Sequence, residues 1–134
     1  MILLDTNACV AAINGRPTSV GERIGATLQR GRKVKVSAVV VFELFYGVAK
    51  SARVEANLRA VETFLRPLSI LTLDAEDGRA AAQIRAQLER AGKPIGPYDY
   101  LIAAQAVRHE LTLITANEKE FASVPGLRFE NWAS

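Results

Sequence analysis

The sequence contains only one cysteine, one histidine and one tryptophan among 134 residues. The single cysteine, Cys9, excludes an internal disulfide and a disulfide-stabilised secreted scaffold, so we expect a protein of the reducing cytoplasm. Cys9 lies in the apolar segment CVAAI, and we interpret it as a small core residue rather than a nucleophile. His109 has no cysteine or second histidine beside it, so a zinc site is not expected and His109 is interpreted as structural or exposed.

Long apolar runs are absent too, and none reaches the roughly 20 residues that a membrane-spanning helix requires. The first residues, MILLDTN, have no basic region and reach an acid at position 5, so they predict a strand rather than a signal peptide. Hydrophobic residues make up 49% of the chain and charged residues 23%, a balance typical of globular proteins. The length fits one domain over residues 1–134, long enough to bury one core and too short for two.

The sequence has no large excess of charge of either sign, since 17 basic and 14 acidic residues give a net charge of only +3. The distribution is uneven, because residues 16–35 contain six basic residues against one acid, Glu22: Arg16, Arg23, Arg30, Arg32, Lys33 and Lys35. Such a patch predicts electrostatic binding of phosphate groups, in particular at residues 30–35, with a solvated helix face and loop as the alternative.

Short apolar strands alternate with amphipathic helices along the whole chain. Strands are predicted at MILL (1–4), VKVS (34–37), SILTL (69–73), LTLIT (111–115) and near LRF (127–129). This alternation predicts a three-layer α/β fold with a central, mostly parallel sheet flanked by helices. Ligands of such sheets bind beyond the carboxyl ends of the strands, so polar residues at those ends are the candidates for a site.

Asp5 and Glu43 are the first two candidates. Asp5 directly follows the first strand, and its alternative role is to cap the next helix. Glu43 is the only charged residue between Val36 and Ala49, in the segment VSAVVVFELFYGVA. An ionised carboxylate in apolar surroundings needs a cationic partner or a raised pKa, which makes Glu43 a candidate for a functional site.

Asp99 and Glu120 are the other two acidic candidates. Asp99 lies in the first turn of a predicted helix, where acids are favoured, but it shares the apolar face of that helix. Glu120 follows the strand LTLIT, and Asn117 with Glu120 also resembles a capping box for a short helix. The sequence leaves open whether Asp99 and Glu120 stabilise the start of a helix or belong to a functional site.

Together these acids predict a metal site at one edge of the sheet. Two carboxylates 4 Å apart repel by about 4 kcal/mol at an effective dielectric constant near 20, so gathering several of them requires a cation. Oxygen ligands without cysteine or histidine favour Mg²⁺ or Mn²⁺.

Four segments together resemble the PIN-domain ribonucleases, and within them the toxins of bacterial VapBC-type toxin–antitoxin pairs. The segments are MILLDTN, FELFYGV, PIGPYDYLIAAQA and LTLITANEKEFASVPGLRFENW, and the resemblance covers essentially the whole chain. It implies a PIN-like fold and an endoribonuclease that uses Mg²⁺, with Mn²⁺ able to substitute. By position, it assigns the catalytic metal ligands to Asp5, Glu43 and Asp99, with Asn7 orienting the site. Asn117 or Glu120 is the candidate for the fourth position.

The resemblance also implies inhibition by a cognate antitoxin, an indirect link to operator DNA through that antitoxin, and a homodimer. Phe42, Phe45 and Tyr46 crowd one predicted helix, and residues 54–65 supply a second apolar face. Because a helix buries only one stripe, we expect the remaining surface to form a groove for an antitoxin helix. The alternative is that these aromatic residues all face the core.

Two other functions stay open from the sequence. One is an α/β phosphatase with Asp5 as the nucleophile, although such enzymes typically carry a second acid where this chain has Asn7. Trapping a phospho-aspartate would identify it. The other is a non-catalytic module that binds a partner protein or RNA, which a failure to bind Mn²⁺ would favour.

Overall fold

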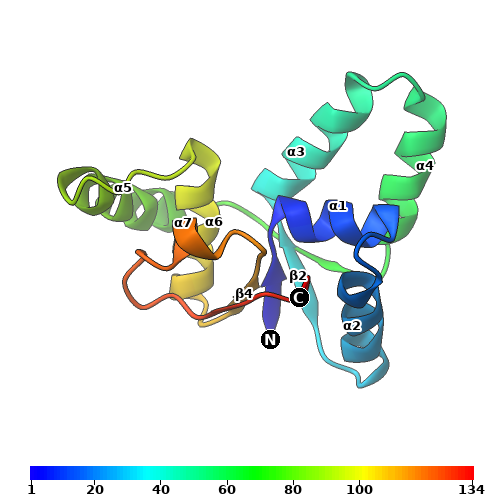
Figure 1. The fold of residues 1–134 in the computed structure, drawn as a ribbon. Helices are drawn as coiled ribbons and strands as arrows, with labels where there is room; N and C mark the ends of the chain where they lie inside the picture. The colour runs from blue at the N-terminus through cyan, green and yellow to red at the C-terminus, as the bar shows by residue number, and fades with distance from the viewer.

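A five-stranded, all-parallel sheet forms the centre of the computed structural model, which describes residues 1–134. The strand order is β3-β2-β1-β4-β5 (Figure 1). The strands are β1 (Ile2–Leu4), β2 (Val34–Ser37), β3 (Ser69–Leu71), β4 (Thr112–Ile114) and β5 (Phe129–Glu130). The predicted three-layer α/β fold is confirmed. The predicted strands SILTL and LTLIT are shorter than expected, and the predicted turn at NEKEF contains one turn of helix.

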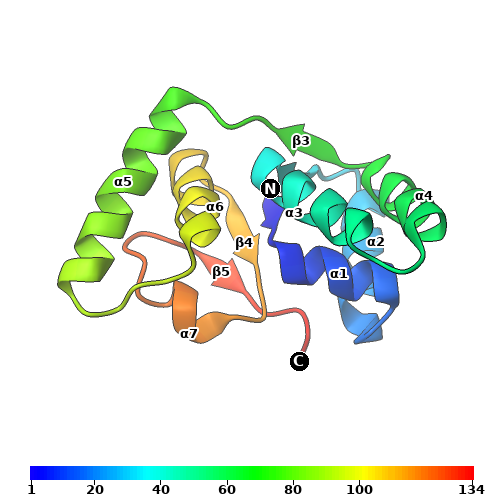
Figure 2. The same cartoon turned by 90° about the horizontal axis from the view of Figure 1, so that it is seen from above.

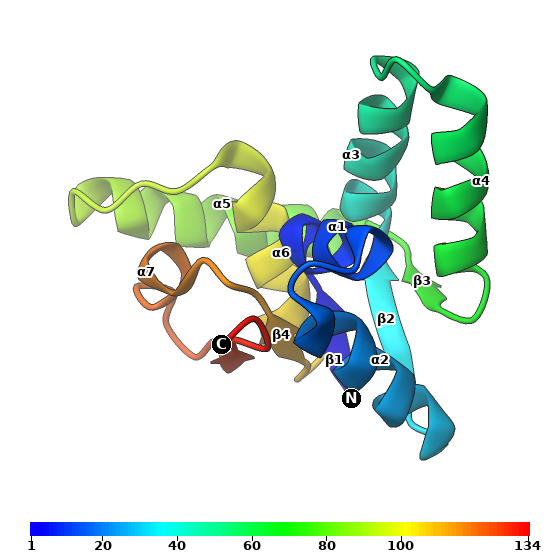
Figure 3. The same cartoon turned by 45° about the vertical axis from the view of Figure 1, so that its right-hand side comes forward.

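Seven helices flank the sheet. They are α1 (Thr6–Asn14), α2 (Thr18–Gln29), α3 (Ala38–Ala49), α4 (Val54–Leu65), α5 (Ala75–Arg90), α6 (Pro97–Arg108) and α7 (Glu118–Phe121). Seen from above, α5 and α6 lie on one side of the strands and α1 to α4 on the other (Figure 2). Helices α3 and α4 rise as an antiparallel pair beyond the sheet edge at which β1 ends (Figures 1 and 3).

The central strand β1 is apolar because it is covered on both faces. Leu3 and Leu4 have no exposed surface, and Cys9 in the following helix is equally buried, as expected for a core residue. Leu4 pairs with Val36 of β2 and with Ile114 of β4. Because these three strands are in register, the residues that follow them emerge together at one edge of the sheet.

A buried polar network fixes α6 against α5. The Asp77 side chain of α5 is completely buried and accepts hydrogen bonds from the Gln105 side chain at 3.1 Å and from Arg108. Burial opposes the charged form of Asp77, but these bonds and the Asp74 amide together hold its pKa below the ordinary value. His109 is exposed, and its Nε2 atom lies 3.7 Å from Asp77 Oδ1. This network anchors the helix that carries Asp99.

No helix has both the length and the apolar composition to cross a membrane.

Candidate active site

Asp5 leaves the sheet at the carboxyl end of β1 and is 4% exposed. Its backbone amide donates to the Ile114 carbonyl at 3.1 Å, and its side chain caps α1 by accepting from the Ala8 amide at 2.8 Å. Burial raises the pKa of this carboxyl, and the negative charges of Glu43 and Glu120 raise it further, against lowering hydrogen bonds from Thr115 and Ala8. Asp5 therefore both caps α1 and lies at the candidate site.

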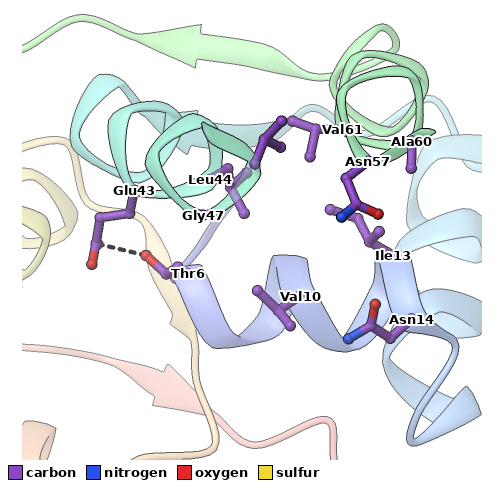
Figure 4. A pocket seen from close by; sticks show the side chains of 11 residues that line it. Thr6, Val10, Ile13, Asn14, Glu43, Leu44, Gly47, Asn57, Ala60 and Val61 are labelled. Atoms are coloured by element: carbon purple, nitrogen blue, oxygen red, sulfur yellow. Dashed lines mark hydrogen bonds between the residues drawn. The ribbon is translucent and has the colours of Figure 1, made fainter. Parts of the chain in front are cut away.

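Glu43 projects from α3 toward the start of α1. The Thr6 hydroxyl donates a hydrogen bond to Glu43 Oε1 at 2.6 Å (Figure 4). Glu43 is half-buried, and it forms no ion pair. Glu43 could be identified from the sequence because its neighbours are apolar. The hydrogen bond from Thr6 could not, since it depends on the residue at which α1 begins.

Asp99 and Glu120 meet at the start of α6. Pro97 begins this helix, and Asp99 follows in its first turn. The pKa of Asp99 rises to about 7, because burial disfavours its charged form and Glu120, in hydrogen-bond contact with it, adds negative potential. Glu120 in turn accepts a hydrogen bond from the Gly96 backbone amide at 2.8 Å. This contact with Gly96 was not predicted from the sequence.

Asn117 supports the acids from the loop after β4. Its side-chain amide donates to Glu120, and its backbone amide donates to Thr115 Oγ1 at 3.0 Å. The predicted capping box is absent, since Asn117 makes no side-chain cap of α7. Asn7 is exposed and forms no side-chain hydrogen bond, so no hydrogen bond joins its side chain to these acids.

The four carboxylates suit a hard divalent cation by their donor chemistry. As the side chains stand, no three acidic, cysteine or histidine side chains are grouped closely enough to hold one ion. Asp5, Glu43 and Glu120 nevertheless all raise the pKa of Asp99, and none of the four forms an ion pair. Two carboxyl groups in contact, Asp99 and Glu120, require either a shared proton or a cation. An oxygen-only set of this kind fits Mg²⁺ or Mn²⁺.

A model of the PIN domain matches residues 2–127. The chain belongs to the PIN-domain family. It is 42% identical over 131 residues to the tRNA(fMet)-specific endonuclease VapC of Shigella flexneri, covering 98% of this chain and 97% of that protein. It is 39% identical over 130 residues to Ribonuclease VapC2 of Rickettsia felis, covering 97% and 96% of the two chains.

Solved structures agree with this relationship. The fold matches VapBC2 from Rickettsia felis, bound to a DNA fragment from their promoter, with a TM-score of 0.91 and 38% identity over 98% of this chain and 99% of that chain. DNA-bound VapBC from Salmonella typhimurium matches with a TM-score of 0.89 and 39% identity, over 98% and 99% of the two chains. The predicted family, PIN-domain ribonucleases of the VapBC toxin type, is confirmed. It favours the nuclease over the phosphatase alternative.

An apolar groove of about 260 Å³ runs from the acids of this PIN domain along α1, α3 and α4. In Figure 4, Val10 and Ile13 of α1 face Leu44 of α3 and Val61 of α4, with Glu43 and Thr6 at one end. The full lining is Thr6, Val10, Ile13, Asn14, Glu43, Leu44, Gly47, Val48, Asn57, Ala60 and Val61. A groove beside residues 54–65 was expected, and it is present.

The aromatic residues predicted to line that groove do not line it. Phe42 and Tyr46 are 53% and 57% exposed and face Tyr98 of α6 instead. The Phe42 ring centroid lies 6.4 Å from that of Tyr46 and 5.6 Å from that of Tyr98. Phe45 packs against the core. We call Phe42, Tyr46 and Tyr98 the aromatic cluster; with Thr6, Glu43, Gly47 and Lys50 it borders a second hollow beside the acids.

Proposed function

We propose that this PIN domain is an endoribonuclease that hydrolyses RNA phosphodiesters with Mg²⁺, for which Mn²⁺ can substitute. The observation that carries this proposal is the convergence of four acids without a cationic side chain, with Asp99 and Glu120 in contact. Family membership supports the nuclease activity. The whole chain, residues 1–134, then acts as one ribonuclease domain in the cytoplasm.

Asp5, Glu43 and Asp99 would hold the ion, with Glu120 and Asn117 completing the site. When bound, the ion supplies Lewis acidity at the phosphodiester and lowers the pKa of an attacking water. Asp99 must lose its proton before it can serve as a ligand, because its pKa is about 7 in the metal-free protein.

Neutral groups of the chain orient these acids. The Thr6 hydroxyl fixes one oxygen of Glu43, and the Gly96 amide fixes one oxygen of Glu120. Ala8 and Thr115 do the same for Asp5. Because every one of these donors is uncharged, they position the carboxylates without neutralising the charge that attracts the ion.

Transfer RNA is the substrate class that the relatives favour. The Shigella flexneri and Salmonella typhimurium relatives, 42% and 39% identical, are both named tRNA(fMet)-specific endonucleases. We extend this class, without a particular transfer RNA, to the present chain.

The apolar groove along α1, α3 and α4 is the surface that we assign to the antitoxin. An amphipathic helix can bury its apolar side chains against Val10, Leu44 and Val61. A basic side chain of that helix would then reach Glu43 at the end of the groove and compete with the metal ion. Operator DNA would be reached indirectly, through the antitoxin.

A homodimer, as the family resemblance implies, completes the proposal. The aromatic cluster supports it, because three large rings that remain exposed together mark an interaction surface. Light scattering of the Phe42→Ala and Tyr98→Ala variants tests this assignment. Conversion to a monomer is the expected result, and an unchanged mass would remove the cluster from the interface.

The proposed activity is tested with the purified chain and bulk transfer RNA. We expect cleavage with Mg²⁺ or Mn²⁺, no cleavage in a chelator, and none by the Asp99→Asn variant. Isothermal titration with Mn²⁺ supplies a readout that is independent of cleavage. Cleavage that persists in the chelator, or Mn²⁺ affinity unchanged in Asp99→Asn, would contradict the proposed site.

A further inference from the structure

A basic hollow lies beside the start of β1, at the other end of that strand from Asp5, and reaches Glu130 of β5. It has a volume of about 350 Å³ and lies beside Met1 and Ile2, where β1 begins. Arg23 and Arg30 of the α2 segment and Arg32 and Lys33 of the turn before β2 line it. Figure 1 shows this turn at the end of the molecule where the N-terminus lies. The predicted patch at residues 30–35 is therefore remote from the active site.

We propose that this basic hollow is a second contact site for the RNA backbone, separate from the place of cleavage. The proposal rests on the proposed ribonuclease function and specifies how that enzyme holds its substrate. It implies that the substrate is an RNA large enough to touch two opposite edges of the domain at once.

Most of the positive charge that lines the hollow is not paired with an acid. Arg30, Arg32 and Lys33 form no ion pair and no side-chain hydrogen bond, and all three are exposed. Arg23 is the exception, since its guanidinium lies 3.7 Å from Glu130. Three uncompensated cations side by side attract successive phosphates of a nucleic acid strand.

The floor of the hollow is held in place. The Arg23 guanidinium stacks 4.5 Å from the centre of the Trp132 ring, and Trp132 Nε1 donates to Glu130 at 2.9 Å. Ser19 Oγ donates to the Trp132 carbonyl at 2.7 Å. The one acid of the hollow, Glu130, is thus already bonded to two neighbours, so the excess positive charge is presented by a fixed surface.

An RNA backbone fits this hollow better than an acidic protein does. Trp132 is 6% exposed, so the hollow offers no accessible aromatic anchor of the kind on which protein interfaces depend. Binding of nucleic acid, in contrast, draws its affinity from phosphate neutralisation alone.

The separation of the two sites sets a minimum size for the RNA. Four residues of extended chain join Met1 to Asp5, which at about 3.3 Å per residue is roughly 13 Å through the protein. That distance equals about four steps of a stacked strand at roughly 3.4 Å each, and the path around the surface is longer. A folded RNA such as transfer RNA can span this distance and touch both sites at once.

Salt-dependent binding of bulk transfer RNA to the full chain tests the proposal, with Glu43→Gln as a common background to prevent cleavage. The combined Arg30→Gln, Arg32→Gln and Lys33→Gln variant should lower the slope of log K against log salt concentration by about 2, since each phosphate contact contributes about 0.7 to 0.9. The matched control removes three exposed arginines without ion pairs at and around α4, by Arg53→Gln, Arg59→Gln and Arg66→Gln.

The outcomes separate this proposal from the proposed function. A reduced slope in the hollow variant alone supports a second RNA site, as does a raised KM for transfer RNA with kcat unchanged when Glu43 is retained. An unchanged slope, an equal loss in the control variant, or lost antitoxin binding with unchanged RNA binding would overturn it. If the wild-type chain binds transfer RNA but never cleaves it, the proposed function fails while the slope measurement still decides on the hollow.

Discussion

Gly96 lies so close to Asp99 that a Cβ atom on the glycine would stand 2.9 Å from Asp99 Oδ2. The same Cβ would lie 3.8 Å from Glu120 Oε1, the oxygen that accepts the Gly96 amide. The missing side chain therefore provides the space in which the two carboxyl groups converge. Gly96 has φ −60° and ψ 146°, a backbone conformation open to any residue, so the requirement for glycine here is spatial.

Replacement of this glycine should damage the site and spare the fold. We expect Gly96→Ala to push the Asp99 carboxylate aside and to weaken Mn²⁺ binding roughly tenfold, the scale on which supporting groups affect metal sites. Titration calorimetry measures the affinity, and circular dichroism checks the fold. Gly25→Ala is the matched control, since a Cβ on Gly25 meets nothing within 4 Å. Equal Mn²⁺ affinity in both variants would contradict the role given to Gly96.

The Asp99 carboxyl should make the metal-free protein less stable as the pH rises. Its folded pKa of about 7 exceeds the ordinary 3.8, so between these values the folded state binds more protons than the unfolded state. Stability from this group is therefore full below the ordinary value and declines as the pH rises toward the folded pKa. Thermal unfolding in a chelator at about pH 5 and about pH 8 should show a smaller decline for Asp99→Asn than for the wild type. Identical declines would contradict the raised pKa.

Saturating Mn²⁺ should reduce the loss of stability at high pH, because an ion that binds the deprotonated acids stabilises the folded state by mass action. The comparison uses the same two pH values with and without the ion. A melting temperature that does not respond to Mn²⁺ at the higher pH would argue against a metal site at Asp99.

Removal of the Glu43 charge should abolish cleavage without unfolding the protein. Glu43→Gln keeps an oxygen that can accept from Thr6 but loses one negative charge from a crowded group of acids. We expect at least a roughly 100-fold loss of cleavage rate and a melting temperature equal to or above that of the wild type in a chelator. Full nuclease activity at ordinary Mg²⁺ concentration would end the assignment of Glu43 as a ligand.

The Thr6→Val variant tests whether Glu43 must be oriented by a hydrogen bond, without changing the charge of Glu43. It removes the 2.6 Å hydrogen bond and leaves the Glu43 carboxylate intact. A loss of roughly tenfold in Mn²⁺ affinity is expected for such a supporting group. If Thr6→Val cleaves RNA and binds Mn²⁺ like the wild type, the hydroxyl does not orient Glu43 for function.

A charge placed in the apolar groove should release the antitoxin. Ala60 lines the groove (Figure 4). Ala56 is on the same helix and outside the groove, and both alanines are exposed. We expect Ala60→Glu to weaken antitoxin binding roughly 30-fold, about 2 kcal/mol, and Ala56→Glu to leave it unchanged. Surface plasmon resonance with the cognate antitoxin measures both. Tight binding by Ala60→Glu would place the antitoxin on another surface.

The acidic site was predictable because its position follows from a rule about sheets. Asp5 stands directly after a strand whose neighbours end in register with it, so any parallel arrangement brings it to the carboxyl edge. Glu43 was recognisable as a lone charge in an apolar segment. The contact between Glu120 and Gly96 joins α7 to the residue that precedes α6, and no local pattern encodes such a contact.

The two faces of α3 could not be distinguished from the sequence. Eleven of its twelve residues are apolar or glycine, and only Glu43 is charged, so the pattern does not define one buried stripe. Leu44 and Val48 turn toward α1 and α4, while Phe42 and Tyr46 turn toward Tyr98. Packing against α4 and α6 decides this division, and that packing exists only in the folded chain.

Glu120 lies near the C-terminal end of the 134-residue chain, and Asp5 lies near its start. The strand β1 pairs with β4, which is far from it in the sequence. A nascent or truncated chain that ends before β4 therefore lacks both a neighbour of its central strand and the fourth acid. The four acids can therefore meet only in a domain in which β1 and β4 have paired, so assembly of the site depends on the fold of the whole domain.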